Sequence, residues 1–294
     1  MLTRRLLSLT VALLDFLPHR ALLGLGSFLG TVFWVFNKRK VDRAEARCVS
    51  ALGLGITPAR KIIRRSYANM GRFAAEFIHL DKLHPHLSSL VAIEGKHHLD
   101  EALRRGKGAL IMTAHIGNWE LAGARMVAEG YAITPLYTPQ RNTAGVDDLI
   151  VSRRTEAAGM HIIPSEGLAL REVFRELKKG NILTFLQDLD ARKEGVLVPF
   201  LGLPASTATG IVRMHQKFGA PIVPVVAVRG SDGVHHTVFV EEILSDQPDE
   251  DGNPFGANME KSLKMCNNLL GHWVEKYPEQ WLWLLDKWES VSRF

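Results

Sequence analysis

The stretch that decides the fold is residues 109–120, which read Ala-Leu-Ile-Met-Thr-Ala-His-Ile-Gly-Asn-Trp-Glu. Its first part is short, apolar and uncharged, which is typical of a buried strand. A glycine and an asparagine follow, and these residues favour a turn. A segment with helical apolar periodicity begins at Trp119. The pattern therefore predicts a strand that delivers His115 to a sheet edge, and a helix whose first turn carries Glu120.

The rest of the chain alternates strand-like and helix-like runs. We expect strands at residues 91–94, 109–113, 132–136, 182–186, 222–228 and 237–240. We expect helices at residues 99–105, 119–128, 146–158, 169–179, 208–218 and 259–277. Apolar strands that alternate with helices indicate an α/β fold, with a mostly parallel sheet that helices cover on both faces.

The N-terminal part is both apolar and basic. Residues 1–72 contain 13 lysines and arginines but three acidic residues, and the longest uncharged apolar piece, residues 21–36, is 16 residues long. A spanning helix needs about 20 residues. A basic segment beside an apolar one favours an anionic membrane surface over nucleic acid. We therefore expect residues 1–40 to be a membrane anchor, either a tilted single span or a helical hairpin in the interface. A buried pair of core helices is the alternative.

Residues 41–294 are expected to form the second domain, with 41–80 as a helical lead-in and 90–294 as the α/β core. The lead-in reads as two amphipathic helices that are broken near residues 53–55. Thr57 fits the N-cap of the second helix, and Pro58 fits its first turn. The basic face of this helix is either solvated or in contact with lipid headgroups.

His115 and Glu120 form the candidate catalytic pair. In a continuous helix, residues five apart point about 140° away from each other. They can therefore meet only if His115 ends a strand and Glu120 begins a helix. Such a pair can take a proton from a hydroxyl group, and the carboxylate would hold the imidazole in the required tautomer. A purely structural histidine at the strand end is the alternative.

Residues 113–120 resemble the H-x4-D/E signature of glycerolipid acyltransferases, and in their full length they resemble bacterial lipid A biosynthesis (lauroyl/myristoyl) acyltransferases. Further blocks that are similar to this family follow in order along most of the chain. They are residues 64–77, 93–95, 106–108, 137–142, 188–190, 195–210 and 278–283.

The resemblance implies an enzyme that transfers a fatty acyl chain from acyl carrier protein, or from acyl-coenzyme A, to a hydroxyl of lipid A or its precursor. It implies His115 and Glu120 as the catalytic residues, with direct transfer and no covalent intermediate. The implied location is the inner membrane, with its anionic lipids and with the catalytic domain on the cytoplasmic side. No cofactor, metal ion or nucleic acid is expected.

Four further residues are candidates for substrate binding: Asn118, Arg141, Asp188 and Asp190. Arg141 follows an expected strand, where an arginine suits a phosphate or the phosphopantetheine of the carrier; a structural ion pair is the alternative. Asp188 and Asp190 follow the strand at residues 182–186, and orienting an arginine or histidine is their favoured role. A metal site there is disfavoured, because no histidine lies nearby in the sequence.

The remaining motifs leave several alternatives open. Residues 196–204 either line an acyl-chain groove or pack in the core. Paired histidines at 84/86, 97/98 and 235/236 read as surface residues rather than metal ligands.

Residues 285–289 read Leu-Asp-Lys-Trp-Glu, where many family members have His-Arg-Arg, an aromatic residue and Lys. Two basic positions are therefore acidic here, which weakens the assignment of a phosphorylated sugar acceptor. The same chemistry on another glycolipid or phospholipid is the main alternative, and a membrane-binding module without catalysis is a further one.

Overall fold

The computed structural model describes residues 16–137, 145–164 and 170–291. Its helices are α2 (His19–Phe36), α3 (Lys38–Leu52), α4 (Ile56–Ile78), α5 (Leu80–Leu83), α6 (Leu87–Leu90), α7 (Lys96–Arg104), α8 (Trp119–Ala128), α9 (Val146–Ser152), α10 (Leu170–Lys178), α11 (Gly210–Phe218) and α12 (Met259–Lys276). Its strands are β1 (Val91–Glu94), β2 (Ala109–Thr113), β3 (Ile133–Tyr137), β4 (Ile163–Pro164), β5 (Ile182–Leu186), β6 (Val196–Phe200), β7 (Leu203–Thr207), β8 (Ile222–Arg229) and β9 (His236–Val240).

Within the described residues, seven strands form one sheet in the order β1-β9-β8-β2-β5-β3-β4. All neighbouring pairs run parallel except β8 and β9, which are antiparallel. The expectation of a mostly parallel sheet is thus confirmed. Strands β6 and β7 form a separate antiparallel hairpin.

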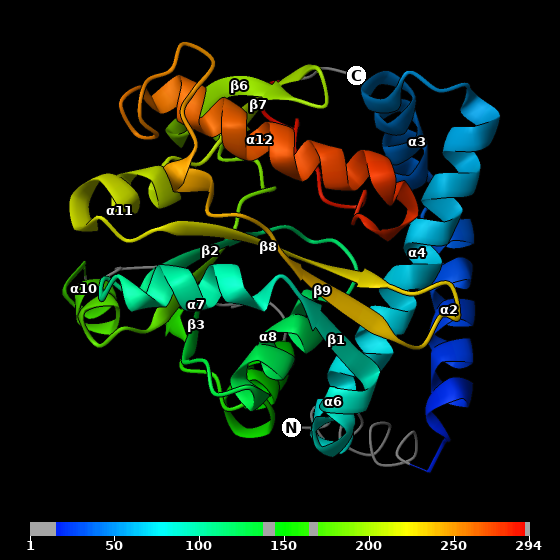
Figure 1. Ribbon diagram of the computed structural model, residues 1–294. Helices are drawn as coiled ribbons and strands as arrows, with labels where there is room; N and C mark the ends of the chain where they lie inside the picture. Colours follow the sequence, from blue (N-terminus) through cyan, green and yellow to red (C-terminus); the bar gives the residue numbers. More distant parts are fainter. Residues whose placement is uncertain (1–15, 138–144, 165–169, 292–294) are drawn as a thin grey trace.

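Helices cover both faces of the sheet, with α7 and α8 on one side and α11 and α12 on the other (Figure 1). Strand β2 contributes side chains to the cores on both faces of the sheet, because successive side chains of a strand point to opposite faces. Leu110 and Met112 belong to the core under α12, whereas Ala109 and Ile111 belong to the core against α7 and α8. All five residues of β2 are buried, which explains its continuous apolar sequence.

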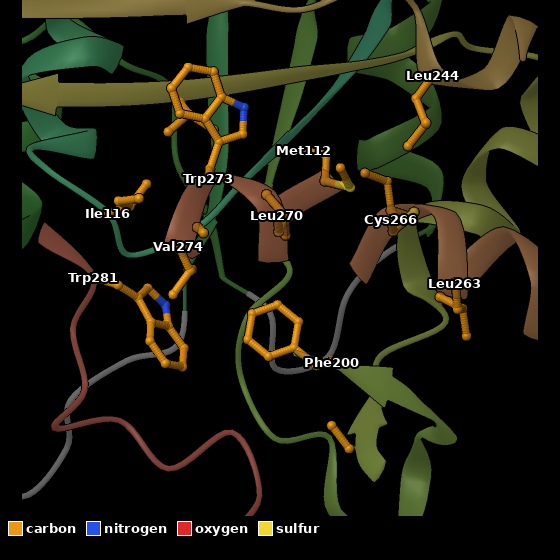
Figure 2. Packing of buried hydrophobic residues seen from close by; sticks show 14 of the residues in the cluster. Met112, Ile116, Phe200, Leu244, Leu263, Cys266, Leu270, Trp273, Val274 and Trp281 are labelled. Carbon is orange, nitrogen blue, oxygen red and sulfur yellow. The ribbon is translucent and has the colours of Figure 1, made fainter. Parts of the chain in front are cut away.

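Helix α12 places an apolar stripe over the sheet. Leu263, Cys266, Leu270 and Trp273 follow each other at helical spacing and are buried. Figure 2 shows this stripe beside Phe200 of the β6–β7 hairpin and Trp281 of the C-terminal segment. The segment at residues 196–204, for which a groove or core packing was considered, is therefore a hairpin whose Val198 and Phe200 are buried in this core.

Helix α2 packs along α4 through glycines (Figure 1). A Cβ atom on Gly26 would lie 2.5 Å from the carbonyl oxygen of Gly71, and one on Gly30 would lie 2.1 Å from that of Tyr67. A Cβ on Gly71 would meet the carbonyl oxygen of Gly26 at 1.9 Å. Only glycine lets the two backbones approach so closely.

The outer face of α2 is apolar and exposed. Phe28, Leu29, Val35 and Phe36 are all more than half exposed. By length and composition, α2 is the one helix among the described residues that is apolar enough to cross a membrane. Only 22% of this 18-residue helix is buried in the protein.

The predicted boundaries agree closely with the structure for several elements. The predictions for β1, β2, β5 and α8 match at both ends, and the break near residues 53–55 separates α3 from α4. The predicted N-cap at Thr57 is wrong: α4 begins at Ile56 after Gly55, which caps it without a side-chain hydrogen bond. Pro58 still lies in the first turn, where a missing N–H costs nothing.

Candidate active site

The parallel pairing of β2 and β5 brings His115 beside Asp188. Thr113 is the register partner of Leu186 at the carboxyl ends of these strands. His115 and Asp188 each follow two residues later, so that the two chains leave the sheet at the same edge. Residues 73 positions apart thereby become neighbours at the end of the sheet, where ligands of open α/β sheets usually bind.

Asp188 holds the imidazole by two hydrogen bonds. Nδ1 of His115 lies 2.8 Å from Oδ1 of Asp188, and the backbone N–H of His115 donates to Oδ2 at 2.8 Å. An ionised carboxylate accepts from an Nδ1–H group, so Nε2 carries the free lone pair. No described residue forms a hydrogen bond with Nε2. This arrangement leaves a base with one accessible nitrogen.

Trp281 completes the environment of Asp188. Its indole N–H donates to Oδ2 of Asp188 at 2.8 Å, and both side chains are buried. Burial would raise the pKa of Asp188, but the charge and hydrogen bonds of His115 and the hydrogen bond from Trp281 outweigh it and leave that pKa below its usual value. Asp188 is thus kept ionised beside the imidazole.

The C-terminal segment is fixed to the loop that carries His115. The N–H of Leu282 donates to the carbonyl oxygen of His115, and that of Gly117 donates to Gln280, both at 3.0 Å. The hydroxyl of Ser66 on α4 donates to the carbonyl of Trp281 at 2.6 Å. Gly117 has a φ of 60°, and a Cβ there would lie 2.1 Å from the carbonyl oxygen of Ala227. The loop therefore needs glycine at this position.

The structure places Glu120 away from the imidazole. Its carboxylate pairs with Arg154, whose Nε and Nη2 lie 3.0 and 2.5 Å from its oxygens, and it accepts from the indole of Trp119 at 3.1 Å. The prediction that Glu120 orients His115 is therefore wrong in this structure, because Asp188 occupies Nδ1. Burial disfavours the cation of Arg154, yet the charge of Glu120 outweighs this effect and raises the pKa of Arg154.

The side chain of Asn118 is buried and makes its hydrogen bonds within the protein. It is fully buried and is the N-cap of α8, where its Oδ1 accepts from the N–H of Leu121 at 3.0 Å. Its Nδ2 donates to Glu76 at 2.7 Å. Glu76 also accepts two hydrogen bonds from Arg229 and one from His236. With its amide used inside the protein, Asn118 has no group directed to a substrate.

Asp190 lies at a different place from its neighbour Asp188. Its carboxylate accepts from the backbone N–H and the hydroxyl of Ser290, at 2.7 and 2.8 Å, and from the N–H of Arg192. These contacts fix the C-terminal segment to the loop after β5, so the predicted substrate contact of Asp190 has no support here. Arg141 lies outside the described residues.

Lys287 is buried behind Asp188 and is fully inaccessible. Its Nζ lies 2.9 Å from the carbonyl oxygen of Leu189, 3.2 Å from that of Ser206 and 3.4 Å from that of Gln187. Burial lowers the pKa of Lys287 to about 8, although the charges of Asp188 and Asp190 oppose that effect. The lysine therefore holds the backbone on both sides of Asp188.

One cavity has His115 in its wall, and a second cavity shares Trp119 with the first. The first, of about 10 Å³, is lined by His115, Ser66, Phe73 and Trp281 and has the size of a single water molecule or hydroxyl. The second is narrow, mostly apolar and has a volume of about 50 Å³. Trp119, Glu120 and Arg154 contribute to its wall, and the other wall residues include Ile111, Met126, Ile133, Met160 and Val225.

Sequence reasoning missed four residues of this site: Trp281, Arg154, Glu76 and Lys287. Trp281 and Glu76 lie in segments that carry the family resemblance, which was their only signal. Arg154 lies in a π-helical turn, Arg153–Ala157, that continues α9, and nothing in the sequence marks it. No group of three or more potential metal ligands occurs among the described residues.

An α/β fold with a histidine–carboxylate pair at the ends of its parallel strands and an apolar cavity nearby has an arrangement suited to a general base. The family model of bacterial lipid A biosynthesis acyltransferases matches residues 3–290, and the chain belongs to this family.

Curated relatives of known name are distant. A lipid A biosynthesis acyltransferase from Haemophilus influenzae is 24% identical over 68% of this chain and 60% of its own length. A phosphatidylinositol mannoside acyltransferase from Mycobacterium tuberculosis is 28% identical over 58% of this chain and 56% of its own length. A lipid A biosynthesis lauroyltransferase from Escherichia coli is 24% identical over 93% of this chain and 87% of its own length. The match thus spans less than two thirds of the first two relatives.

Proposed function

We propose that this protein is a membrane-associated O-acyltransferase that moves a fatty acyl chain from a thioester donor to a hydroxyl of lipid A or its precursor. Acyl carrier protein is the favoured donor, and acyl-coenzyme A is the alternative. The observation that carries the proposal is the hydrogen bond of 2.8 Å between His115 Nδ1 and the buried Asp188, because it leaves Nε2 as a base at the end of the sheet.

The proposed reaction needs no covalent enzyme intermediate. Nε2 of His115 accepts the proton of the acceptor hydroxyl while that oxygen attacks the thioester carbonyl. The tetrahedral intermediate then collapses: its C–S bond breaks, and the imidazolium gives its proton to the leaving thiolate. Asp188 holds the ring tautomer and stabilises the transient cation. An ester and a free thiol result, so atoms and charges balance.

The apolar cavity beside Trp119 is the proposed site of the acyl chain. Its volume of about 50 Å³ has room for only a few water molecules, since about 10–15 Å³ on this measure holds one. An acyl chain would therefore have to displace side chains. Met126 and Met160 line this cavity, and methionine adapts its shape more easily than branched residues. The Glu120–Arg154 pair would hold the polar end of the cavity.

The acceptor has a second candidate. Relatives named phosphatidylinositol mannoside acyltransferases match this chain at 25% to 28% identity, close to the 24% of the lipid A enzymes. Asp286 occupies a position where the family resemblance implies a basic residue, and it forms an ion pair with Arg47. A glycolipid other than lipid A is therefore the alternative acceptor.

Helix α2, which belongs to the membrane anchor proposed for residues 1–40, is proposed to lie in the interface rather than to cross the bilayer. Helix α2 packs along α4 through Gly26 and Gly30, which supports an orientation fixed by the catalytic domain. Its exposed outer face is apolar, as expected of a helix that lies in the headgroup region. We propose the cytoplasmic face of the inner membrane as its location.

The test is acyl transfer by purified full-length protein, with acyl carrier protein and coenzyme A thioesters and with lipid A precursor or phosphatidylinositol mannoside as acceptor. Replacing His115 by Ala should lower kcat by about 10²–10⁴-fold, because a general base is removed. Replacing the exposed His97 on α7 by Ala is the matched control and should leave kcat unchanged.

Full activity of the His115→Ala variant would contradict the proposed chemistry. An enzyme that acylates only phosphatidylinositol mannoside would instead contradict the assignment of lipid A and would favour the alternative acceptor.

A further inference from the structure

A second, polar cleft lies next to the cavity of His115. It has a volume of about 540 Å³ and lies between α4 and the loop that joins β8 to β9. Asn69 and Gln280 line both the cleft and the His115 cavity. A substrate that occupies the cleft would therefore reach the catalytic base across these two residues.

Arg72 is the cation that the fold directs to this cleft. Its Nη1 donates to Oδ1 of Asn69 at 2.8 Å, and Nδ2 of Asn69 donates to the carbonyl of Glu279 at 2.8 Å. In the part of the chain that the structure describes, no carboxylate lies within 4 Å of the Arg72 guanidinium. The remaining donors of Arg72 are thus oriented but not neutralised.

The neighbouring arginine differs from Arg72 in this respect. Arg229 also lines the cleft, but it forms a bidentate pair with the buried Glu76, at 2.7 and 2.6 Å. Burial, followed by the positive charge of Arg229, lowers the pKa of Arg72, and Glu76 opposes this only in part. An anion in the cleft would offset both effects.

The carboxylates that line the cleft do not neutralise Arg72. Asp232 accepts hydrogen bonds from the ring and the backbone N–H of His235 and from the N–H of Val234, so its charge is used within its own turn. Glu279 contributes one carboxylate, and the exposed Arg65 adds a further cation. Beyond the internally paired groups, the cleft thus has two arginines and one carboxylate.

We propose that this cleft binds a phosphate ester of a substrate, with Arg72 as its principal ligand and Arg65 as a second cation. Guanidinium groups suit phosphate because they present several N–H donors in a fixed plane. The phosphate belongs either to the headgroup of the acceptor or to the pantetheine of the donor. The inference rests on the proposed acyl transfer for the identity of these substrates, but not for the anion site itself.

Direct binding tests the site without turnover. Titration calorimetry on full-length protein in detergent would use three probes: inorganic phosphate, glucosamine 1-phosphate for the acceptor, and 4′-phosphopantetheine for the donor. Replacing Arg72 by Gln should weaken the preferred probe about 10-fold or more, since a charge-assisted pair is lost. Arg72→Lys should retain part of the affinity as a point charge.

Lys61→Gln is the matched control, because it removes one positive charge from the exposed side of the same helix outside the cleft. It should bind all three probes as the unchanged protein does. Preference for glucosamine 1-phosphate assigns the cleft to the acceptor, and preference for 4′-phosphopantetheine assigns it to the donor. Equal binding by Arg72→Gln and Lys61→Gln would overturn the proposal.

Kinetics supply an independent readout. Arg72→Gln should raise KM for one of the two substrates about 10-fold and change the other KM little. An unchanged KM for both substrates would also overturn the site. If the unchanged protein transfers no acyl chain but loses probe binding on substitution of Arg72, the proposed function fails while the phosphate site stands.

Discussion

Asp188 receives three hydrogen bonds, two from His115 and one from Trp281. One of them comes from the ring and one from the backbone of the same histidine, so the carboxylate sets both the tautomer and the position of the base. A carboxylate with this relation to a catalytic histidine does not itself take up the proton; it orients the ring and stabilises its charged form. The tautomer and position of His115 therefore depend on the charge of one buried residue.

Replacement of Asp188 by Asn should lower kcat by about 10²–10⁴-fold, because an amide stabilises the wrong tautomer and cannot balance an imidazolium. Steady-state transfer assays would measure this effect. Glu120→Gln is the matched change of a nearby carboxylate that pairs with Arg154 instead of His115, and we expect a smaller loss of kcat. A larger loss for Glu120→Gln would show that Glu120 and not Asp188 supports the base.

At the scale of elements, the contact between α2 and α4 depends on glycines at three positions. Gly26 and Gly30 on α2 meet Gly71 and Tyr67 on α4. Because a methyl group would collide with backbone atoms rather than with a flexible side chain, the helices themselves would have to separate. The apolar helix α2 is thus held to α4 by the close fit of their backbones.

Gly71→Ala should destabilise the protein by roughly 1–3 kcal/mol or more, the usual cost of overpacking, and should expose α2 to proteolysis. Gly24→Ala is the control on the same helix but outside the contact, since a Cβ at Gly24 has no atom within 4 Å. It should stabilise by up to about 1 kcal/mol through helix propensity. Urea unfolding in detergent would compare the two. Equal stability of both variants would show that the close approach of α2 and α4 does not contribute to the free energy of unfolding.

The elements that could be predicted are those whose local sequence pattern reflects which of their residues are buried. β2 and β5 are short apolar runs, and α8 has a polar cap followed by an apolar period. The β6–β7 hairpin was not predicted as strands, because Pro199 and Pro204 argue against a ladder. In the structure these two prolines are register partners in a two-stranded hairpin, where an unpaired edge tolerates them.

The site was predicted only in part for a related reason. Spacing along the chain pointed to Glu120 as the partner of His115, since it is the nearest carboxylate in sequence. The strand order places β5 next to β2, and it is this order that makes Asp188 the partner. Strand order follows from packing of the whole sheet, so local patterns do not contain it.

At the scale of the whole molecule, the buried carboxylate of Glu76 connects helices α4 and α8 to the sheet. It lies on α4 and hydrogen-bonds to Arg229 at the end of β8, to His236 at the start of β9 and to Asn118 at the cap of α8. Burial would raise the pKa of Glu76, but His236 and Arg229 outweigh burial and lower it to about 2 from the usual 4.5. The folded protein therefore prefers ionised Glu76.

A lowered pKa stabilises the fold above about pH 4.5, and this contribution is lost as the pH falls toward about 2. The loss should be on the order of 3 kcal/mol. Glu76→Gln should be less stable at pH 7, since Arg229 loses its partner, and should lose less stability on acidification. Urea unfolding between pH 2 and 7 would measure both.

The exposed Glu275 on α12 gives the control. Glu275→Gln should follow the unchanged protein at every pH. A constant difference in unfolding free energy between Glu76→Gln and the unchanged protein over the whole range would contradict a lowered pKa for Glu76.

The last described residues have a consequence for the order in which this protein matures. Trp281 and Lys287 secure the carboxylate that orients His115, yet they leave the ribosome more than 90 residues after Asp188. A nascent chain can form the sheet and bring the histidine to the carboxylate while both are still unsupported. We expect the hydrogen bonds from Trp281 and Lys287 to hold this arrangement only after both residues have been synthesised. The order of synthesis therefore makes firm positioning of His115 a late event in folding.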